Sequence, residues 1–167
     1  MIKYYLVIFL FDFIFGQDKG IKAYNDQRYD DARIYYENII KNRMDDDSAK
    51  FGLGVSAYKQ QDLETASQLF NQVKNSTNNE LASKANYNLG NILRELNQYE
   101  ESLSSYKNAI ELDPNDEDSK INYELLKKFM NQQKQDNQDQ DQSGQDNQGQ
   151  DQSGQDNQGQ DQSGQDN

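Results

Sequence analysis

Residues 89–115, LGNILRELNQYEESLSSYKNAIELDPN, decide the fold of this chain. Gly90 is followed twelve residues later by a small residue, Ser102, and four residues after that by an aromatic one, Tyr106. A bulky residue, Tyr99, stands three positions before Ser102. The same pattern recurs twice upstream, at a period of about 34 residues, where the glycine and the small residue are Gly20 with Ala32 and Gly54 with Ala66. Three copies in register indicate a repeat protein.

Each copy favours a pair of antiparallel helices, because apolar residues recur three or four positions apart along both halves. We expect the glycine and the small residue to lie where the two backbones approach closely. Such a hairpin cannot bury its apolar face alone and needs a neighbour stacked on it. Asp47-Ser48 and Asn115-Asp116 are expected to cap the helices that follow them. We predict an all-α fold with helices near residues 18–27, 30–42, 47–60, 63–75, 80–96, 99–111 and 117–133.

The repeat resembles the tetratricopeptide repeat. The positions that carry the resemblance are Gly20, Ala32, Gly54, Ala66, Leu89, Gly90, Tyr99, Ser102, Tyr106, Ala109 and Pro114. It implies a tetratricopeptide domain, an α-solenoid, over residues 17–134, with repeats at about 17–44, 47–78 and 83–116. The copies depart from the family pattern four positions before the glycine, where the usual aromatic residue is replaced by Gly16, Lys50 and Asn86.

A seventh helix at 117–133 would close the stack. Ile121, Leu125 and Phe129 lie on one stripe of this helix, and lysines lie on the other. Repeat arrays end in a helix whose outer face is polar, because no further repeat covers it. The pattern is therefore typical of a solvating cap.

The first sixteen residues have the layout of a secretory signal peptide. One basic residue, Lys3, precedes an apolar run that Asp12 interrupts, and the run ends at a small residue, Gly16. A spanning helix needs roughly 18 or more apolar residues, so cleavage after Gly16 is the first interpretation. Retention of the leader as a membrane anchor is the second, and a buried first helix is the third.

Residues 135–167 repeat a segment of Gln, Asp, Asn, Gly and Ser and contain no apolar residue. Nothing in them can form a core, so this tail is predicted to be disordered. It carries eight aspartates and no Lys or Arg, which leaves about two thirds of the net charge of −12 in the tail. The tail is interpreted as a solvating spacer, with a weak calcium-binding array as the alternative.

Composition excludes much chemistry. The chain has no cysteine and no histidine, so thiolate nucleophiles, imidazole bases and the commonest zinc ligands are absent from it. Its 17 basic residues are dispersed and outnumbered by 29 acidic ones, which disfavours a nucleic-acid partner. Asp45-Asp46-Asp47 precede a predicted helix and are interpreted as favouring its N-terminal dipole rather than as a metal site. We predict no enzyme activity, cofactor, metal or small-molecule substrate.

The tetratricopeptide resemblance implies that first helices line a concave groove that holds a protein partner. The predicted groove residues combine aromatic rings with charged groups, the types that anchor interfaces. They are Tyr24, Phe51, Val55, Tyr58, Lys59, Lys84, Tyr87, Asn91 and Arg94. For Tyr24 and Tyr58, packing between repeats is an equal alternative. The dicarboxylate clamp of chaperone-binding members falls on Gln17, Ile21, Gly52, Lys84 and Asn88, of which only Lys84 fits.

The leader, the segment Asn122-Tyr123-Glu124-Leu125 in the closing helix and the Gln-rich tail resemble the BatC-type tetratricopeptide proteins of Bat aerotolerance operons in Gram-negative bacteria. This resemblance implies an exported, periplasmic chain whose partners are membrane proteins with von Willebrand A domains. Two alternatives stay open. One is a scaffold for envelope or cell-wall assembly, and the other is a calcium-dependent surface protein that acts through its acidic tail.

The tail should contribute nothing to the stability of the repeats, because it has no apolar area to bury. A chain that ends at Lys134 is expected to keep the melting temperature of the full chain, measured by circular dichroism. A loss of several degrees would show that the tail docks on the repeats.

Overall fold

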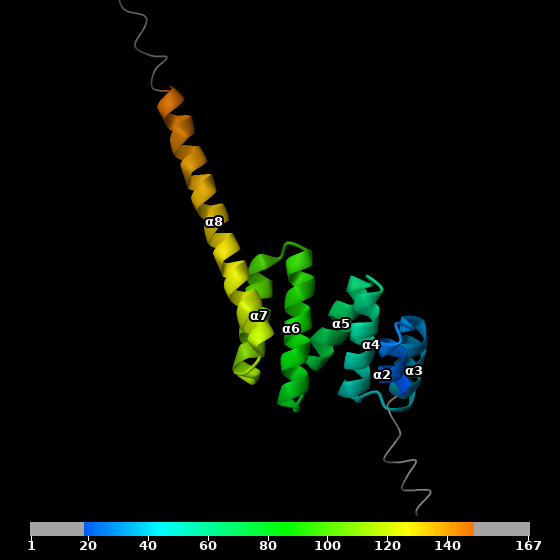
Figure 1. The fold of residues 1–167 in the computed structure, drawn as a ribbon. Coiled ribbons are helices and arrows are strands. Elements are labelled where there is room, and N and C mark those ends of the chain that lie inside the picture. Colours follow the sequence, from blue (N-terminus) through cyan, green and yellow to red (C-terminus); the bar gives the residue numbers. More distant parts are fainter. Residues whose placement is uncertain (1–18, 149–167) are drawn as a thin grey trace, which may run out of the picture. The chain divides into compact units, whose positions relative to one another are not determined.

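A computed structural model describes residues 19–148, and side chains are described up to residue 135. The predicted leader and residues 149–167 of the predicted tail lie outside the described residues. The described part is all-α, as predicted, and Figure 1 shows its helices in order. They are α2 (Lys19–Asn25), α3 (Tyr29–Asn42), α4 (Asp47–Lys59), α5 (Leu63–Val73), α6 (Asn79–Glu95), α7 (Tyr99–Leu112) and α8 (Glu117–Gln148).

The helices pack as hairpins. Helix α2 pairs with α3, α4 with α5, and α6 with α7, and each second helix also contacts the first helix of the next pair. The first helices also contact one another, since α4 lies between α2 and α6 and touches both. This stack forms one compact unit that ends at Leu126, inside α8. Within the described residues, no helix is both long enough and apolar enough to span a bilayer.

The second unit starts at Lys127 and contains the rest of α8. The sequence predicted that this helix ends near residue 133, but it continues to Gln148. Residues 134–148 contain no proline and one glycine, Gly144, so nothing in them stops a helix that has already started.

Local chemistry sets the helix ends. Asp46 accepts a hydrogen bond from the Ala49 amide at 3.0 Å, so the cap of α4 lies one residue before the predicted Asp47-Ser48 pair. Asp116 caps α8 in the same way, as predicted. Within each hairpin the chain turns through one residue with positive φ. These turn residues are Gln27, Gln61 and Asn97, with φ of 60°, 63° and 59°.

An aromatic ring on each second helix lies against the repeat glycine of the first helix. A Cβ atom placed on Gly90 would come within 2.6 Å of the Tyr106 ring. Gly54 faces Phe70 in the same way, with a closest approach of 2.9 Å. The glycine therefore makes room for the aromatic residue sixteen positions later. The predicted close approach to the small residue is also present, since the Ser102 hydroxyl donates to the Gly90 carbonyl at 2.7 Å.

Tyr36 extends this contact from one repeat to the next. Its ring would lie within 2.4 Å of a Cβ on Gly20 and within 2.3 Å of one on Gly52. Gly20 belongs to its own hairpin on α2, whereas Gly52 belongs to α4 of the next hairpin. The ring thus fills the space between the two repeats.

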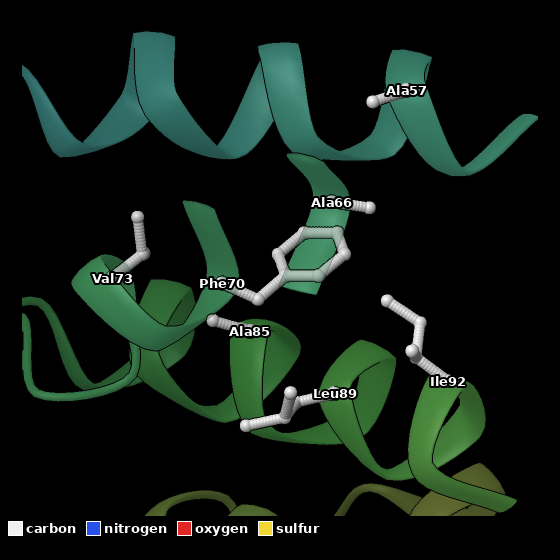
Figure 2. Packing of buried hydrophobic residues seen from close by; sticks show 7 residues of the cluster. All are labelled: Ala57, Ala66, Phe70, Val73, Ala85, Leu89 and Ile92. Atoms are coloured by element: carbon white, nitrogen blue, oxygen red, sulfur yellow. The ribbon is translucent and has the colours of Figure 1, made fainter. Parts of the chain in front are cut away.

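The main core is shared between repeats rather than enclosed in one. Figure 2 shows Phe70 of α5 between Ala57 on α4 and Ala85 on α6. Phe70 and Val73 have no exposed area. Because three helices from two hairpins supply this cluster, unfolding one hairpin exposes the apolar face of the other.

Replacing Gly90 by Ala should destabilise the domain by about 2 kcal/mol, because Tyr106 is fully buried and cannot move away from the new methyl group. Gly54→Ala is the matched control. Phe70 is equally buried, but its closest approach of 2.9 Å gives a smaller overlap. We therefore expect a smaller loss of stability, part of which the gain of about 1 kcal/mol in helix propensity offsets. Urea unfolding of both variants checks this order. Equal midpoints would show that the ring contact does not limit the helix spacing.

Candidate partner-binding surface

The nine predicted groove residues lie on three first helices. Tyr24 is on α2, Phe51 to Lys59 are on α4, and Lys84 to Arg94 are on α6. Helix α4 contacts both other helices, and we call the side of the stack on which the nine residues are predicted to lie the first-helix face. None of them is buried, and Lys59, Lys84 and Arg94 are exposed.

The aromatic residues of this face are held from behind by other rings. Phe51 packs on Phe70 with ring centroids 5.6 Å apart, and Tyr87 packs on Tyr106 at 6.1 Å. Each of these two rings packs against the second helix of its own hairpin and is still partly exposed. A ring fixed in this way loses little side-chain entropy when a partner covers it.

Tyr24 and Tyr58 differ in what fixes them. Tyr24 packs edge-on against Tyr29 of its own hairpin, with centroids 5.5 Å apart. The Tyr58 hydroxyl instead donates to the Glu95 carboxylate on the next first helix. Burial, and then this carboxylate, raise the pKa of Tyr58, so the phenol remains a donor at neutral pH. Tyr58 thus links α4 to α6 across the face.

A depression of about 310 Å³ lies beside this link. Tyr58, Asn91, Arg94 and Glu95 line it. Its lining combines polar and apolar area, and it holds one exposed guanidinium, that of Arg94. An acidic or hydrogen-bonding side chain of a partner would fit these groups.

Asn91 is a structural residue as well as a predicted contact residue. Its Oδ1 accepts the Tyr106 hydroxyl at 2.7 Å and the Asn122 amide at 3.3 Å. Burial raises the pKa of Tyr106, whose hydroxyl therefore stays a donor. Sequence reasoning missed Asn122, which also reaches the Tyr87 hydroxyl at 3.4 Å. Its position, 34 residues after Asn88, was the signal that could have found it.

The clamp positions show why a carboxylate clamp does not form among the described residues. Gly52 has no side chain and lies under the Tyr36 ring. Lys84 is the one position that fits, and its ammonium is paired with Glu80 at 2.5 Å.

Asp46 and Asp47, at the start of α4, have partners within the chain. Asp46 caps the helix, and Asp47 pairs with Lys50 at 3.5 Å. No cluster of three potential metal ligands occurs in the part of the chain that the structure describes.

Stacked hairpins with glycine–aromatic contacts define a helical-repeat protein. Two family models, both described as tetratricopeptide repeat, match residues 18–80 and 83–116, which together make up more than half of the chain. The chain therefore belongs to the tetratricopeptide repeat family. No curated protein matches it significantly.

Solved structures agree with this fold. The tetratricopeptide domain of OM64 from Arabidopsis is 21% identical, with a TM-score of 0.62 over 66% of this chain and 90% of that one. The first such domain of Spaghetti (RPAP3), solved with the HSP90 peptide SRMEEVD, is 18% identical, with a TM-score of 0.62 over 68% and 88%. The Yersinia enterocolitica secretion chaperone SycD, in complex with a peptide of the translocator YopD, is 16% identical, with a TM-score of 0.60 over 66% and 88%.

Asn91→Ala should destabilise the domain by about 1–2 kcal/mol, because it leaves the buried Tyr106 hydroxyl without its acceptor. Tyr106→Phe removes the same hydrogen bond from the other side. A double-mutant cycle on thermal stability should therefore give a coupling energy of about 1 kcal/mol. Additive losses would mean that the two side chains do not depend on each other.

Proposed function

We propose that this chain is a non-catalytic scaffold that binds a segment of a protein partner on the first-helix face. The observation that carries the proposal is the set of half-buried rings on that face, which are held by second-helix rings and yet partly accessible. Rigid aromatic residues and arginine are the commonest anchors of protein interfaces. Tetratricopeptide domains typically bind peptides of other proteins, as the RPAP3 domain and SycD do in the solved structures described above.

The chemistry of the face supports a partner other than an acidic chaperone tail. The peptide in the RPAP3 structure ends in Glu-Glu-Val-Asp. In this chain the only clamp residue that fits is Lys84, and Glu80 already neutralises it. An internal segment that presents apolar and hydrogen-bonding side chains fits the rings, Asn91 and Arg94 better than a free terminal carboxylate does.

The cellular setting belongs to the same proposal. An exported, periplasmic location, with the leader cleaved or kept as an anchor, rests on residues 1–16. A Bat-type complex with membrane proteins carrying von Willebrand A domains rests on the leader, the start of α8 and the Gln-rich tail. Envelope or cell-wall assembly is the alternative scaffold role, and the genes beside this one would separate the two. The calcium alternative rests on the tail alone, and millimolar calcium should release heat on a tail peptide if it holds.

Changing Tyr58, Tyr87 and Arg94 together to Ala should weaken partner binding well over tenfold, since each interface anchor typically contributes about 2 kcal/mol or more. Glu101→Ala with Lys107→Ala is the control, because both residues are exposed on the second helix α7. The partner is identified by crosslinking in native envelopes, and its affinity for each purified variant is then measured. Circular dichroism verifies that both variants fold. Normal binding by the triple variant with loss in the control pair would place the partner on the second helices.

A further inference from the structure

The first part of α8 repeats the pattern of α6 at a spacing of 34 residues. Ala85 and Ile92 of α6 have no exposed area, and their counterparts Ser119 and Leu126 are 0% and 2% exposed. The same register that buries α6 therefore buries α8 up to Leu126. This segment is the first helix of a fourth repeat, and the chain supplies no hairpin partner for it within the described residues.

The side of α8 that such a partner would cover is polar. Glu124 stands where Gly90 stands in α6, and Gly90 is the residue that lies under the Tyr106 ring. Lys120, four residues before Glu124, pairs with Glu117 at 2.7 Å. The absence of a second helix is thus accommodated by charged side chains, as expected for the end of a repeat array.

Two exposed apolar residues of this segment flank Asn122, which contacts α6. Ile121 and Leu125 are each 54% exposed, and they stand where Tyr87 and Asn91 stand in α6. Asn122, between them, donates to the Tyr87 hydroxyl and to the side-chain oxygen Oδ1 of Asn91. The two apolar side chains therefore continue the first-helix face.

Charge indicates the remaining chemistry of the occupant. Arg94 and Lys59 are exposed on the same face, and no described carboxylate forms an ion pair with either of them. Glu95, the nearest acid along α6, accepts the Tyr58 hydroxyl. An occupant with an acidic side chain would complement these cations. The chain's own tail does not fit, because residues 135–167 have no apolar side chain to cover Ile121 and Leu125.

We propose that the binding surface extends onto α8 and takes an amphipathic segment of a protein partner, with apolar side chains over Ile121 and Leu125 and an acidic one at Arg94. This inference rests on the proposed function, since it assumes that the first-helix face is where a partner binds. It adds the class of segment and a fourth helix to the contact.

The test uses a display library of random 16-residue peptides selected on the purified chain. The selected peptides should share two or more apolar residues and an Asp or Glu. For a fluorescent copy of the best peptide, Ile121→Ser with Leu125→Ser should weaken binding at least tenfold in fluorescence anisotropy, as should Arg94→Ala. Changing the acidic residue of the peptide to its amide should abolish the effect of Arg94→Ala.

The matched control is Ile34→Ser with Met44→Ser. These residues are 58% and 76% exposed and lie on α3 and in the turn after it, so the control removes similar apolar area elsewhere. It should change the affinity less than twofold. Melting curves should show that both double variants stay folded, because all four side chains are largely exposed.

Three results would overturn the inference. Peptides that need Tyr58 and Tyr87 but tolerate the α8 double variant would leave the proposed function standing and remove only its extension. Peptides insensitive to both sets, or a library that enriches none, would remove the proposed function as well. A dimer that becomes a monomer in the α8 double variant, measured by analytical ultracentrifugation, would make a second copy of the chain the occupant.

Discussion

The contact between an aromatic ring and a helix glycine governs the geometry of this stack. Phe70 and Tyr106 each lie against a glycine of the preceding helix so closely that a single methyl group would collide with the ring. Tyr36 does so on two helices at once. The ring therefore fixes how near the paired helices come, and that spacing decides which side chains become buried. Interiors packed this densely do not absorb an added methyl group without a shift of the backbone.

The same contact explains how the first-helix face keeps its shape. Phe51 and Tyr87 rest on the rings that lie against the glycines, Phe70 and Tyr106. The two sets of rings form a continuous layer, from the glycine contact to the surface offered to a partner. A change at the glycine would therefore move the interface residues as well as the core. Stability and the proposed recognition therefore share one set of ring contacts.

Much of the fold could be predicted from the sequence because the repeat needs small residues at the positions where its helices approach closely. The glycines, Ala32, Ala66 and Ser102 gave the helices to within a few residues. The predicted role of the glycine was only partly right. The spacing indicates that the glycine and the small residue lie close together, but it does not indicate that an aromatic ring lies between the helices. The N-cap of α4 is Asp46 and not the predicted Asp47-Ser48 pair, because the sequence alone does not distinguish three successive aspartates as caps. The end of α8 was missed because a polar sequence without proline carries no stop signal.

The candidate surface was harder to predict than the fold. The nine residues lie on three successive first helices, and their individual contacts depend on neighbours distant in sequence. Asn91 faces the groove and still supplies its amide oxygen to Tyr106 and Asn122. Asn86 replaces a usual aromatic residue and is buried, with its amide donating to the Lys74 carbonyl near the end of α5 at 3.2 Å. A polar residue at a usually aromatic position thus supplies a hydrogen bond to a carbonyl group at a helix end. No local sequence pattern predicts this contact.

The end of the repeat array at α8 carries both a residue that stops the repeats and exposed apolar residues. A further hairpin would need a glycine where Glu124 stands, because a ring must fit there for the second helix to approach. Glutamate at this position therefore ends the repeats sterically, and its charge keeps the uncovered side hydrated. Ile121 and Leu125 stand where Tyr87 and Asn91 stand in α6, two residues that contact Tyr106 and are also partly open to solvent. The proposed partner segment would cover these two side chains, and it would extend the proposed binding surface from α6 to α8.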